Sequence, residues 1–246
     1  MNKTFPTIEA AIADIKDGSI IGIGGFFAAG VPRTLLQGLI KKGAKDLTIC
    51  CGSGPLLGAY RELDQLVEGN QIKKLIDSYG LFRSATKGST HPFEQKIRSG
   101  EIEFEVYPMG TLAEKYRAAG AGIPAFYTPV GAGSLVEESI LSNLEANRAK
   151  KETKQINGIT CVLEYALKLD YAFIHAYMGD EEGNLKYRKT ARNFNHVMAT
   201  AASTTIAEVE NLVLPGDIEP DHVHTPGIYV QRIVHVERIC FDITNL

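Results

Sequence analysis

The sequence has no excess of charge of either sign. Its 246 residues include 26 basic and 29 acidic side chains, which give a formal net charge of −3. Such a chain has neither the polycationic surface that holds nucleic acid nor a basic face for an anionic membrane. We therefore expect small molecules and proteins as partners, with no nucleic acid and no membrane.

Long apolar runs and paired cysteine motifs are also missing. The longest apolar stretch, Ile20 to Val31, holds four glycines and is shorter than the roughly 18 residues of a membrane span. The first ten residues lack the charged and apolar regions of a signal peptide. The four cysteines show no C-x-x-C spacing, which favours a reducing cytoplasm. We expect no targeting or membrane-spanning segment and a cytoplasmic protein.

The segment Asp17 to Pro32, DGSIIGIGGFFAAGVP, places a short apolar stretch directly before a glycine-rich loop. The dinucleotide fingerprint G-x-G-x-x-G begins at Gly22 and Gly24 but meets Phe27 where its third glycine belongs. The acidic residue that binds the ribose in such sites is missing too. Asp46 comes before the next apolar run, Leu47 to Cys51, whereas the motif needs an acidic residue after it. The segment is therefore not a dinucleotide-binding loop.

The phosphate-binding motif G-x-x-x-x-G-K-[ST] fails in the same loop. Gly25 and Gly30 have the right spacing, but Val31-Pro32 stands where Lys and Ser or Thr must reach phosphate and metal. The loop still offers backbone amides that a ligand can approach, and Phe26-Phe27 adds apolar surface beside them. We predict a binding site of another kind.

Hydrophobic periodicity predicts helices and strands along the whole chain. Thr7 caps an expected helix that extends to Lys16, and Gly43 ends another that begins at Arg33. Strands are expected at residues 19–23, 47–51, 71–77, 102–106, 171–178 and 203–213, with a hairpin turn at 179–184. Without repeats or a linker, the pattern predicts one α/β domain, residues 1–246, with a mostly parallel or mixed central sheet flanked by helices.

Two more turns are expected at the carboxyl ends of strands, where open α/β sheets bind ligands. The first is Cys51-Gly52-Ser53, and the second is Tyr107 to Gly110. A capping box at Thr111 to Glu114 predicts that a helix begins there and ends near Gly120. The three turns together predict a pocket. No regular element is expected in residues 81–92 and 120–133, and residues 146–155 are expected to form a charged, solvated excursion.

No cluster in the sequence offers a complete nucleophilic or metal site. Cys51 stands at a strand end, where a nucleophile could sit, but a buried apolar role is the alternative. Ser53 lacks the G-x-S-x-G spacing of a nucleophile elbow, and His222 with His224 has no third metal ligand nearby. We expect no metal site.

Two charged groups remain open to either of two interpretations. Glu137-Glu138 could supply a general base or only the acidic first turn of a helix. Arg188, Lys189, Arg192 and Asn193 could meet an anionic ligand, or could face water or a partner chain. Glycine-lined turns can orient a substrate and donate amides but supply no nucleophile, so the residues indicate half of an active site.

Six stretches carry a family resemblance over nearly the whole chain. They are Asp17-Gly18, Gly24-Gly25-Phe26, Gly30-x-Pro32, Gly110 to Pro129, Tyr187 to Asn195 and His224 to Val234. In these stretches the chain resembles the A-type (α) subunit of the two-subunit 3-oxoacid (succinyl-CoA:acetoacetate type) coenzyme A transferases. The resemblance implies the CoA-transferase (NagB/RpiA-like) fold and assembly with a similar B-type (β) subunit.

The same resemblance implies where the nucleophile lies. In this family the β subunit supplies a glutamate that attacks the acyl-CoA thioester, forms an acyl-glutamyl anhydride and then becomes a glutamyl-CoA thioester. The Glu-Asn-Gly motif of that glutamate does not occur in this sequence. We expect no catalytic residue in this chain and no cofactor beyond coenzyme A as a substrate. The expected substrate and oxyanion pocket consists of Gly24, Gly25, Phe26, Phe27, Gly30, Cys51, Gly52, Ser53, Met109 and Gly110.

The chain departs from the family at two places. Relatives carry Pro-Gln-Gly where this chain has Pro108-Met109-Gly110, and that glutamine is taken to donate a hydrogen bond to the thioester oxyanion. A thioether cannot donate. Relatives also carry Ser-Asn-Asn or Ser-Asn-Asp at residues 51–53 and a shorter segment at 81–92, so the acyl pocket is expected to differ.

The function expected from this resemblance is transfer of CoA between an acyl-CoA thioester and a carboxylic acid, with this chain as the α subunit. Met109 keeps an alternative open, in which the chain is part of an acyl-CoA or ring-cleaving hydrolase on the same scaffold. A non-catalytic subunit that binds small molecules is the third alternative.

Overall fold

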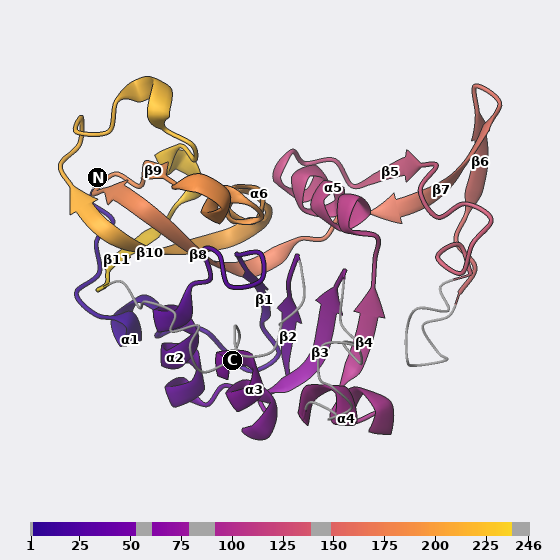
Figure 1. Ribbon diagram of the computed structural model, residues 1–246, viewed down its shortest axis with the longest axis horizontal. Coiled ribbons are helices and arrows are strands. Elements are labelled where there is room, and N and C mark those ends of the chain that lie inside the picture. Colours follow the sequence, from indigo (N-terminus) through magenta and orange to yellow (C-terminus); the bar gives the residue numbers. More distant parts are fainter. Residues whose placement is uncertain (1, 53–60, 79–91, 139–148, 238–246) are drawn as a thin grey trace.

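A computed structural model of the protein describes residues 2–52, 61–78, 92–138 and 149–237 (Figure 1). Its main sheet has eight strands, seven of them in the order β11-β10-β8-β1-β2-β3-β4, with β9 paired to β8. All pairs are parallel except β8 with β9. The strands are β1 (Ile20–Ile23), β2 (Leu47–Cys50), β3 (Ile72–Asp77), β4 (Glu103–Val106), β8 (Leu169–Asp180), β9 (Leu185–Lys186), β10 (Ala202–Val213) and β11 (Arg232–His235).

Helices cover both faces of this sheet. On one face, strand residues such as Ile49 and Leu75 share a core with α1 to α4, and on the other their neighbours Cys50 and Ile76 pack with α5 and α6. This alternation is what a strand buried on both faces requires. The helices are α1 (Ile8–Ala11), α2 (Arg33–Lys42), α3 (Arg61–Glu68), α4 (Pro92–Ser99), α5 (Met109–Gly120) and α6 (Asn195–Ala201), with short 3₁₀ turns η2 (Lys189–Arg192), η3 (Pro220–His222) and η4 (Gly227–Tyr229).

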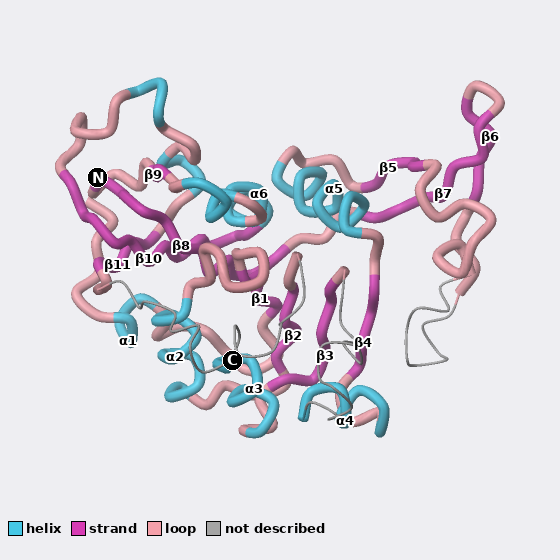
Figure 2. The backbone as a smooth tube through the Cα atoms, viewed as in Figure 1, coloured by secondary structure: helices cyan, strands magenta, loops and turns pink. Residues whose placement is uncertain are grey.

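A second, antiparallel sheet of three strands lies to one side of the main body (Figure 2). Its order is β5 (Ala125–Thr128), β7 (Ile159–Tyr165) and β6 (Thr153–Ile156). Glu164 of β7, 2% exposed, accepts hydrogen bonds from Lys115 of α5 at 3.0 Å and from Lys151. The side chains of Lys115 and Lys151 also lie over the ring of Tyr107. These contacts join the small sheet to α5.

The structure confirms the predicted α/β class, the strand positions and the helix from Arg33 to Lys42 with its left-handed Gly43 end. Thr7 caps α1 as predicted, since its Oγ1 accepts from the N–H of Ala10 at 3.1 Å. The helix is shorter than expected, however, and ends at Ala11. The Arg232 guanidinium donates to the Ala11 carbonyl at 2.6 Å. This side chain therefore takes the place of the backbone N–H that would bond to that carbonyl if the helix continued.

Two further expectations were wrong. The helix α5 begins at Met109, and Thr111 lies buried in its first turn without capping it. The N–H of Tyr107 still bonds to β3, and Pro108 has its φ preset near the helical value, so the helix begins directly after the proline. Residues 120–133 contain β5, whose backbone bonds are supplied by β7, more than thirty residues away in sequence. Among the described residues no helix is long and apolar enough to cross a bilayer.

Candidate functional site

The glycine loop, residues 24–30, leaves the carboxyl end of β1 and folds back on itself. Phe26 and Ala29 exchange backbone hydrogen bonds of 3.0 Å in both directions, which makes a tight turn. The N–H of Gly24 donates to the Phe173 carbonyl of β8 at 2.9 Å and is therefore occupied. Gly25 has a φ of 115°, and Phe27 adopts a left-handed φ of 49° without being glycine. Such strain is common where a loop is shaped for binding.

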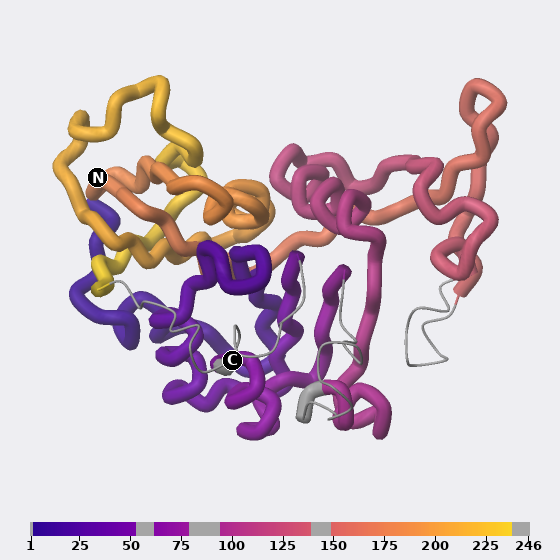
Figure 3. The backbone as a smooth tube through the Cα atoms, viewed as in Figure 1, coloured from indigo at the N-terminus to yellow at the C-terminus, as the bar shows by residue number. Residues whose placement is uncertain are grey.

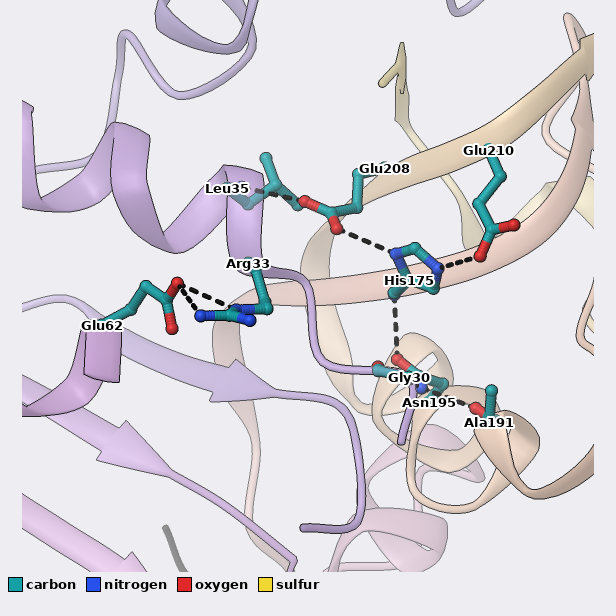
Figure 4. Close-up of polar contacts among 9 residues, drawn as sticks. All are labelled: Gly30, Arg33, Leu35, Glu62, His175, Ala191, Asn195, Glu208 and Glu210. Carbon is teal, nitrogen blue, oxygen red and sulfur yellow. Dashed lines mark hydrogen bonds and ion pairs between the residues drawn. The ribbon is translucent and has the colours of Figure 1, made fainter. Parts of the chain in front are cut away.

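Asn195, at the start of α6, holds this loop in place (Figure 4). Its Oδ1 accepts from the N–H of His175 at 3.0 Å, and its Nδ2 donates to the carbonyls of Gly30 and Ala191, both at 2.8 Å. A Cβ on Gly24 would lie 1.9 Å from that Oδ1, so this contact requires glycine. The buried amide of Asn195 thus joins the glycine loop, β8 and α6. Figure 3 shows the glycine loop beside residues 188–201. Asn195 lies in one of the stretches that carry the family resemblance, but no local pattern predicted its role.

The second predicted turn, at the end of β2, meets α5 and α6 beneath this loop. Tyr116 of α5 donates its hydroxyl to the Cys51 carbonyl at 3.1 Å. Gly52 lies against the ring of Phe194, where a Cβ would approach the ring carbon Cγ to 2.2 Å. Tyr116 and Phe194 meet edge to face, with ring centroids 6.5 Å apart. Ser53 lies outside the described residues, as do residues 81–91 of the predicted surface loop.

The third turn brings the first residues of α5 to the same edge of the sheet. Strands β1 to β4 are neighbours and parallel, so the glycine loop, Cys51-Gly52 and the start of α5 all follow carboxyl ends. Met109 is the first residue of α5 and is 38% exposed. Where the family resemblance implies a glutamine that donates to an oxyanion, this chain has an accessible thioether at a helix N-terminus.

Two hollows flank the segment of residues 193–195. The α5–α6 groove, about 420 Å³, is lined by Gly110, Ala113, Glu114, Arg117, Asn193, Phe194, His196 and Val197. The loop pocket, about 530 Å³, is lined by residues 28–31, Arg33, His175 and Tyr177 of β8, residues 188–191 and Glu210 of β10. Asn193 joins the two, because its Nδ2 donates to the Ala29 carbonyl at 2.9 Å. Of the sequence-predicted residues, Gly110 lines the groove and Gly30 lines the loop pocket.

A line of charged side chains lies behind the loop. His175 bonds to Glu208 through Nδ1 at 2.8 Å and to Glu210 through Nε2 at 3.1 Å. Burial alone would lower the pKa of His175, but the two carboxylates outweigh it and the pKa is raised. Glu208 also accepts from the N–H of Leu35 in the first turn of α2 at 2.9 Å. Sequence reasoning missed this line, although titratable residues inside two strongly apolar strands were a visible signal.

Three other groups of candidates, at Cys51, His222 with His224, and Glu137, are either buried or already hydrogen-bonded. Cys51 is 1% exposed, and burial raises the pKa of its thiol well above the ordinary value, so a thiolate nucleophile is disfavoured. The Nδ1 of His224 accepts from the N–H of Tyr187 at 3.0 Å, and His222 pairs with Glu219. Glu137 accepts from the N–H of Gly133, which lowers the pKa of its carboxyl and weakens it as a base. Within the described ranges, no three His, Cys, Asp or Glu residues gather as metal ligands.

These features define an α/β protein with its candidate site at the carboxyl edge of a parallel sheet. The coenzyme A transferase family model matches residues 5–236. The A-type subunit of a probable succinyl-CoA:3-ketoacid coenzyme A transferase of Mycobacterium tuberculosis is 41% identical over 243 residues, covering 96% of this chain and 94% of the relative. The A-type subunit of the 3-oxoadipate CoA-transferase of Pseudomonas putida is 43% identical over 239 residues, with the same coverage. The chain therefore belongs to the coenzyme A transferase family.

Solved structures share the fold. The acyl-CoA transferase YdiF of Escherichia coli O157:H7 superposes with a TM-score of 0.81 at 21% identity, over 96% of this chain. This chain spans 47% of the length of YdiF. Glutaconate coenzyme A-transferase of Acidaminococcus fermentans gives a TM-score of 0.76 at 22% identity, over 96% of this chain and 76% of that one. The predicted CoA-transferase fold is confirmed.

Proposed function

We propose that this chain is the α subunit of a heteromeric CoA transferase that moves CoA between an acyl-CoA thioester and a carboxylic acid. The observation that carries the proposal is the family match over residues 5–236 in a chain whose sequence lacks the Glu-Asn-Gly nucleophile motif. The two relatives are each named as the A-type subunit of a transferase, which supports a β-type partner for this chain. The proposed domain of this subunit is residues 1–246.

In the proposed reaction the β subunit provides a glutamate, whose carboxylate oxygen attacks the thioester carbon and expels CoA thiolate. The thiolate then attacks the glutamyl carbonyl of the resulting anhydride and releases the first acid, which leaves a glutamyl-CoA thioester. The second acid takes up CoA by the reverse of these two steps. Each step exchanges one acyl bond for another, so no cofactor is needed beyond CoA itself as a substrate.

This chain contributes one wall of the shared site. Among the described residues, the N–H groups of Phe27 and Gly30 have no hydrogen-bond acceptor, and both residues are partly exposed, so these two N–H groups remain available to a substrate oxygen. The α5–α6 groove, with Gly110, Ala113 and Phe194 in its lining, offers mainly apolar surface to an acyl chain. The proposed pocket keeps the predicted residues, with Gly24, Phe26, Cys51 and Gly52 shaping it and Met109 beside it. Ser53, outside the described residues, stays a prediction.

The proposed location is the cytoplasm. Support comes from Cys50, Cys51 and Cys161, three buried cysteines that are free thiols.

The test is CoA exchange by the full chain purified with the protein encoded beside it. We expect the pair to convert an acyl-CoA and an acceptor acid into the exchanged products, and each protein alone to be inactive. After incubation with acyl-CoA alone, mass spectrometry should find CoA bound to the partner and not to this chain. No exchange over a broad panel of acids would refute the transferase, and a CoA adduct on this chain would refute the assignment of the nucleophile.

Met109 favours one alternative function, an acyl-CoA hydrolase, and the same assay distinguishes a hydrolase from a transferase. A hydrolase would release free CoA and acid from acyl-CoA without any acceptor, because water takes the place of the second carboxylate. The transferase predicts that free CoA accumulates only slowly and that product formation requires the acceptor.

A further inference from the structure

The loop pocket contains charges that the proposed transferase chemistry does not use. Its walls come from four separate parts of the chain, namely residues 28–31 with Arg33, β8, β10 and residues 188–191. At about 530 Å³ the cavity is large enough for a phosphate or carboxylate group together with the part of a molecule that carries it. The charged side chains around it determine which kind of ligand it suits.

Two cations in the lining lack counterions. The guanidinium of Arg188 lies over the ring of Tyr177, with its central carbon 4.4 Å from the ring centroid. This stacking orients Arg188 but leaves its N–H donors unused. Within the described part of the chain, neither Arg188 nor Lys189 has a hydrogen bond or ion pair from its side chain. Both residues are exposed and can be reached from solvent.

The acids near the pocket, in contrast, are already paired. Glu210 bonds to Nε2 of His175 at 3.1 Å, and Glu208 bonds to Nδ1 of the same ring. The third cation of the lining, Arg33, is neutralised by Glu62 through two contacts of 2.8 and 2.9 Å. Arg33 and Glu62 cancel, whereas protonated His175 balances only one of its two carboxylates. Arg188 and Lys189 outweigh the remaining negative charge, so the pocket as a whole is positive.

The backbone that carries the two cations is held in an unfavourable conformation. Lys189 has a left-handed φ of 52°, which costs a residue other than glycine about 1 kcal/mol. Two bonds to the same segment maintain it, one from the N–H of Ala191 to the Arg188 carbonyl at 3.2 Å and one from Asn195 to the Ala191 carbonyl. A pair of cations that served only solubility would not need this fixed geometry.

From this geometry we infer that the loop pocket is a binding site for a doubly charged oxyanion, a phosphate or dicarboxylate, held between Arg188 and Lys189. Arginine matches the paired oxygens of such a group in a bidentate fashion, and lysine adds a point charge. Glu210 opposes the ligand less than a free carboxylate would, because its carboxylate is hydrogen-bonded to His175. Binding requires neither turnover nor the β subunit, so it stands apart from the proposed function.

The test is equilibrium binding of four probes to the full chain at low salt, namely pyrophosphate, adenosine 3′,5′-bisphosphate, succinate and, as a singly charged reference, acetate. We expect saturable binding of at least one dianion and none of acetate. Binding of the phosphate compounds alone assigns the site to a phosphate ligand such as the nucleotide end of CoA. Binding of succinate alone assigns it to a dicarboxylate, and either result supports the inference.

Variants locate the binding. Arg188→Gln/Lys189→Gln should weaken it at least about tenfold, the usual effect of losing charge-assisted hydrogen bonds. Lys41→Gln/Lys168→Gln removes the same charge at exposed positions elsewhere and should leave it unchanged. Tyr177→Phe keeps the ring under Arg188 and should bind as the wild type does, whereas Tyr177→Leu should bind more weakly. The inference is overturned if no dianion binds at about 10 mM or if the two double variants bind equally well.

Discussion

At the scale of single residues, Asn195 has the largest structural role in the candidate site. Its side chain accepts a hydrogen bond from a backbone N–H of β8 and donates to two backbone carbonyls, one in the glycine loop and one in the turn before α6. Because the amide is buried, no water can replace it when it is removed. The loop conformation therefore depends on a residue about 170 positions away in sequence.

We predict that Asn195→Ala destabilises the protein by about 2–4 kcal/mol and lowers CoA exchange, because three partly buried backbone groups lose their partner. Asn195→Asp keeps the acceptor for the His175 N–H but loses both donations, so we expect it to be impaired as well. Urea unfolding and exchange rates measure the two effects. Asn211→Ala, which removes a single bond to the Tyr177 carbonyl, is the control and should cost about 1 kcal/mol. Equal losses at the two positions would contradict the proposed role.

Gly30 and Gly43 form a matched pair for a second test. Their φ angles are 71° and 72°, but a Cβ on Gly30 would lie 2.7 Å from the Ala191 carbonyl oxygen, whereas one on Gly43 meets nothing within 4 Å. Gly43→Ala should cost about 1 kcal/mol for the left-handed backbone alone. Gly30→Ala should cost about 2–4 kcal/mol and should also lower exchange, because the clash displaces the loop. Thermal unfolding compares them, and equal melting temperatures would show that the close approach is unimportant.

Met109 gives the most direct test of the oxyanion donor. Met109→Gln introduces a side-chain N–H at an accessible position in the first turn of α5. Loss of one such donor typically costs about a hundred- to thousandfold in rate, so we expect the substitution to raise kcat for exchange by at least about tenfold. Met109→Leu, with no donor, should behave as the wild type. An unchanged kcat in Met109→Gln would mean that the free amides of the glycine loop already supply the donor.

At the scale of elements, the line Glu208–His175–Glu210 ties β8 and β10 to the first turn of α2. The two strands place His175 directly opposite Glu208, and Glu208 reaches on to the N–H of Leu35. Three elements thus share one set of charged hydrogen bonds at the edge of the site.

This arrangement predicts how stability depends on pH. The folded-state pKa of His175 is raised above its ordinary value of 6.5 by the two carboxylates, against the effect of burial. The protonated ring therefore contributes stability that is fully present below pH 6.5 and is lost as the pH rises through the raised folded value. Unfolding free energies between pH 6 and 9 should show the advantage of the wild type over His175→Gln shrinking with pH. Glu210→Gln should weaken the dependence, and an advantage that grows with pH would contradict the assignment.

The elements that the sequence predicted correctly are those with local signals. Apolar runs identified β2 and β8, and the glycine at position 43 identified the end of α2. The pattern did not reveal β5, whose irregular, glycine- and proline-rich surroundings hide a strand that distant β7 stabilises. For the site, glycines marked the three turns, but the contacts of Asn195 and His175 depend on which strands become neighbours. No local pattern contains that information.

At the scale of the whole molecule, the small sheet is attached to the main body through charges buried beneath α5. Glu164 accepts from two lysines, and Lys115 is only 5% exposed. Burial lowers the pKa of Lys115, although Glu164 opposes this effect. The position of the helix that carries Met109 therefore depends on an ion pair shared with the second sheet.

We predict that Glu164→Gln destabilises the protein by about 3–5 kcal/mol, because it leaves buried Lys115 and partly buried Lys151 without their carboxylate. Glu219→Gln breaks an exposed pair with His222 and should cost less than about 0.5 kcal/mol. Urea unfolding measures both. Replacing the buried pair together, as Lys115→Met/Glu164→Leu, should recover much of the loss. A small effect of Glu164→Gln would mean that other contacts hold the two sheets together.

The strand order has a consequence for the growing polypeptide. Strands β1 to β4 are synthesised first, but the other neighbour of β1 in the sheet is β8, which is synthesised later. The glycine loop also lacks its hydrogen bond to Asn195 until that residue has been synthesised. A nascent chain emerging from the ribosome can therefore build half of the sheet while the loop is still unanchored. The binding edge becomes complete only after about four-fifths of the protein has been synthesised. Premature termination before Asn195 would yield a fragment with its binding loop unformed.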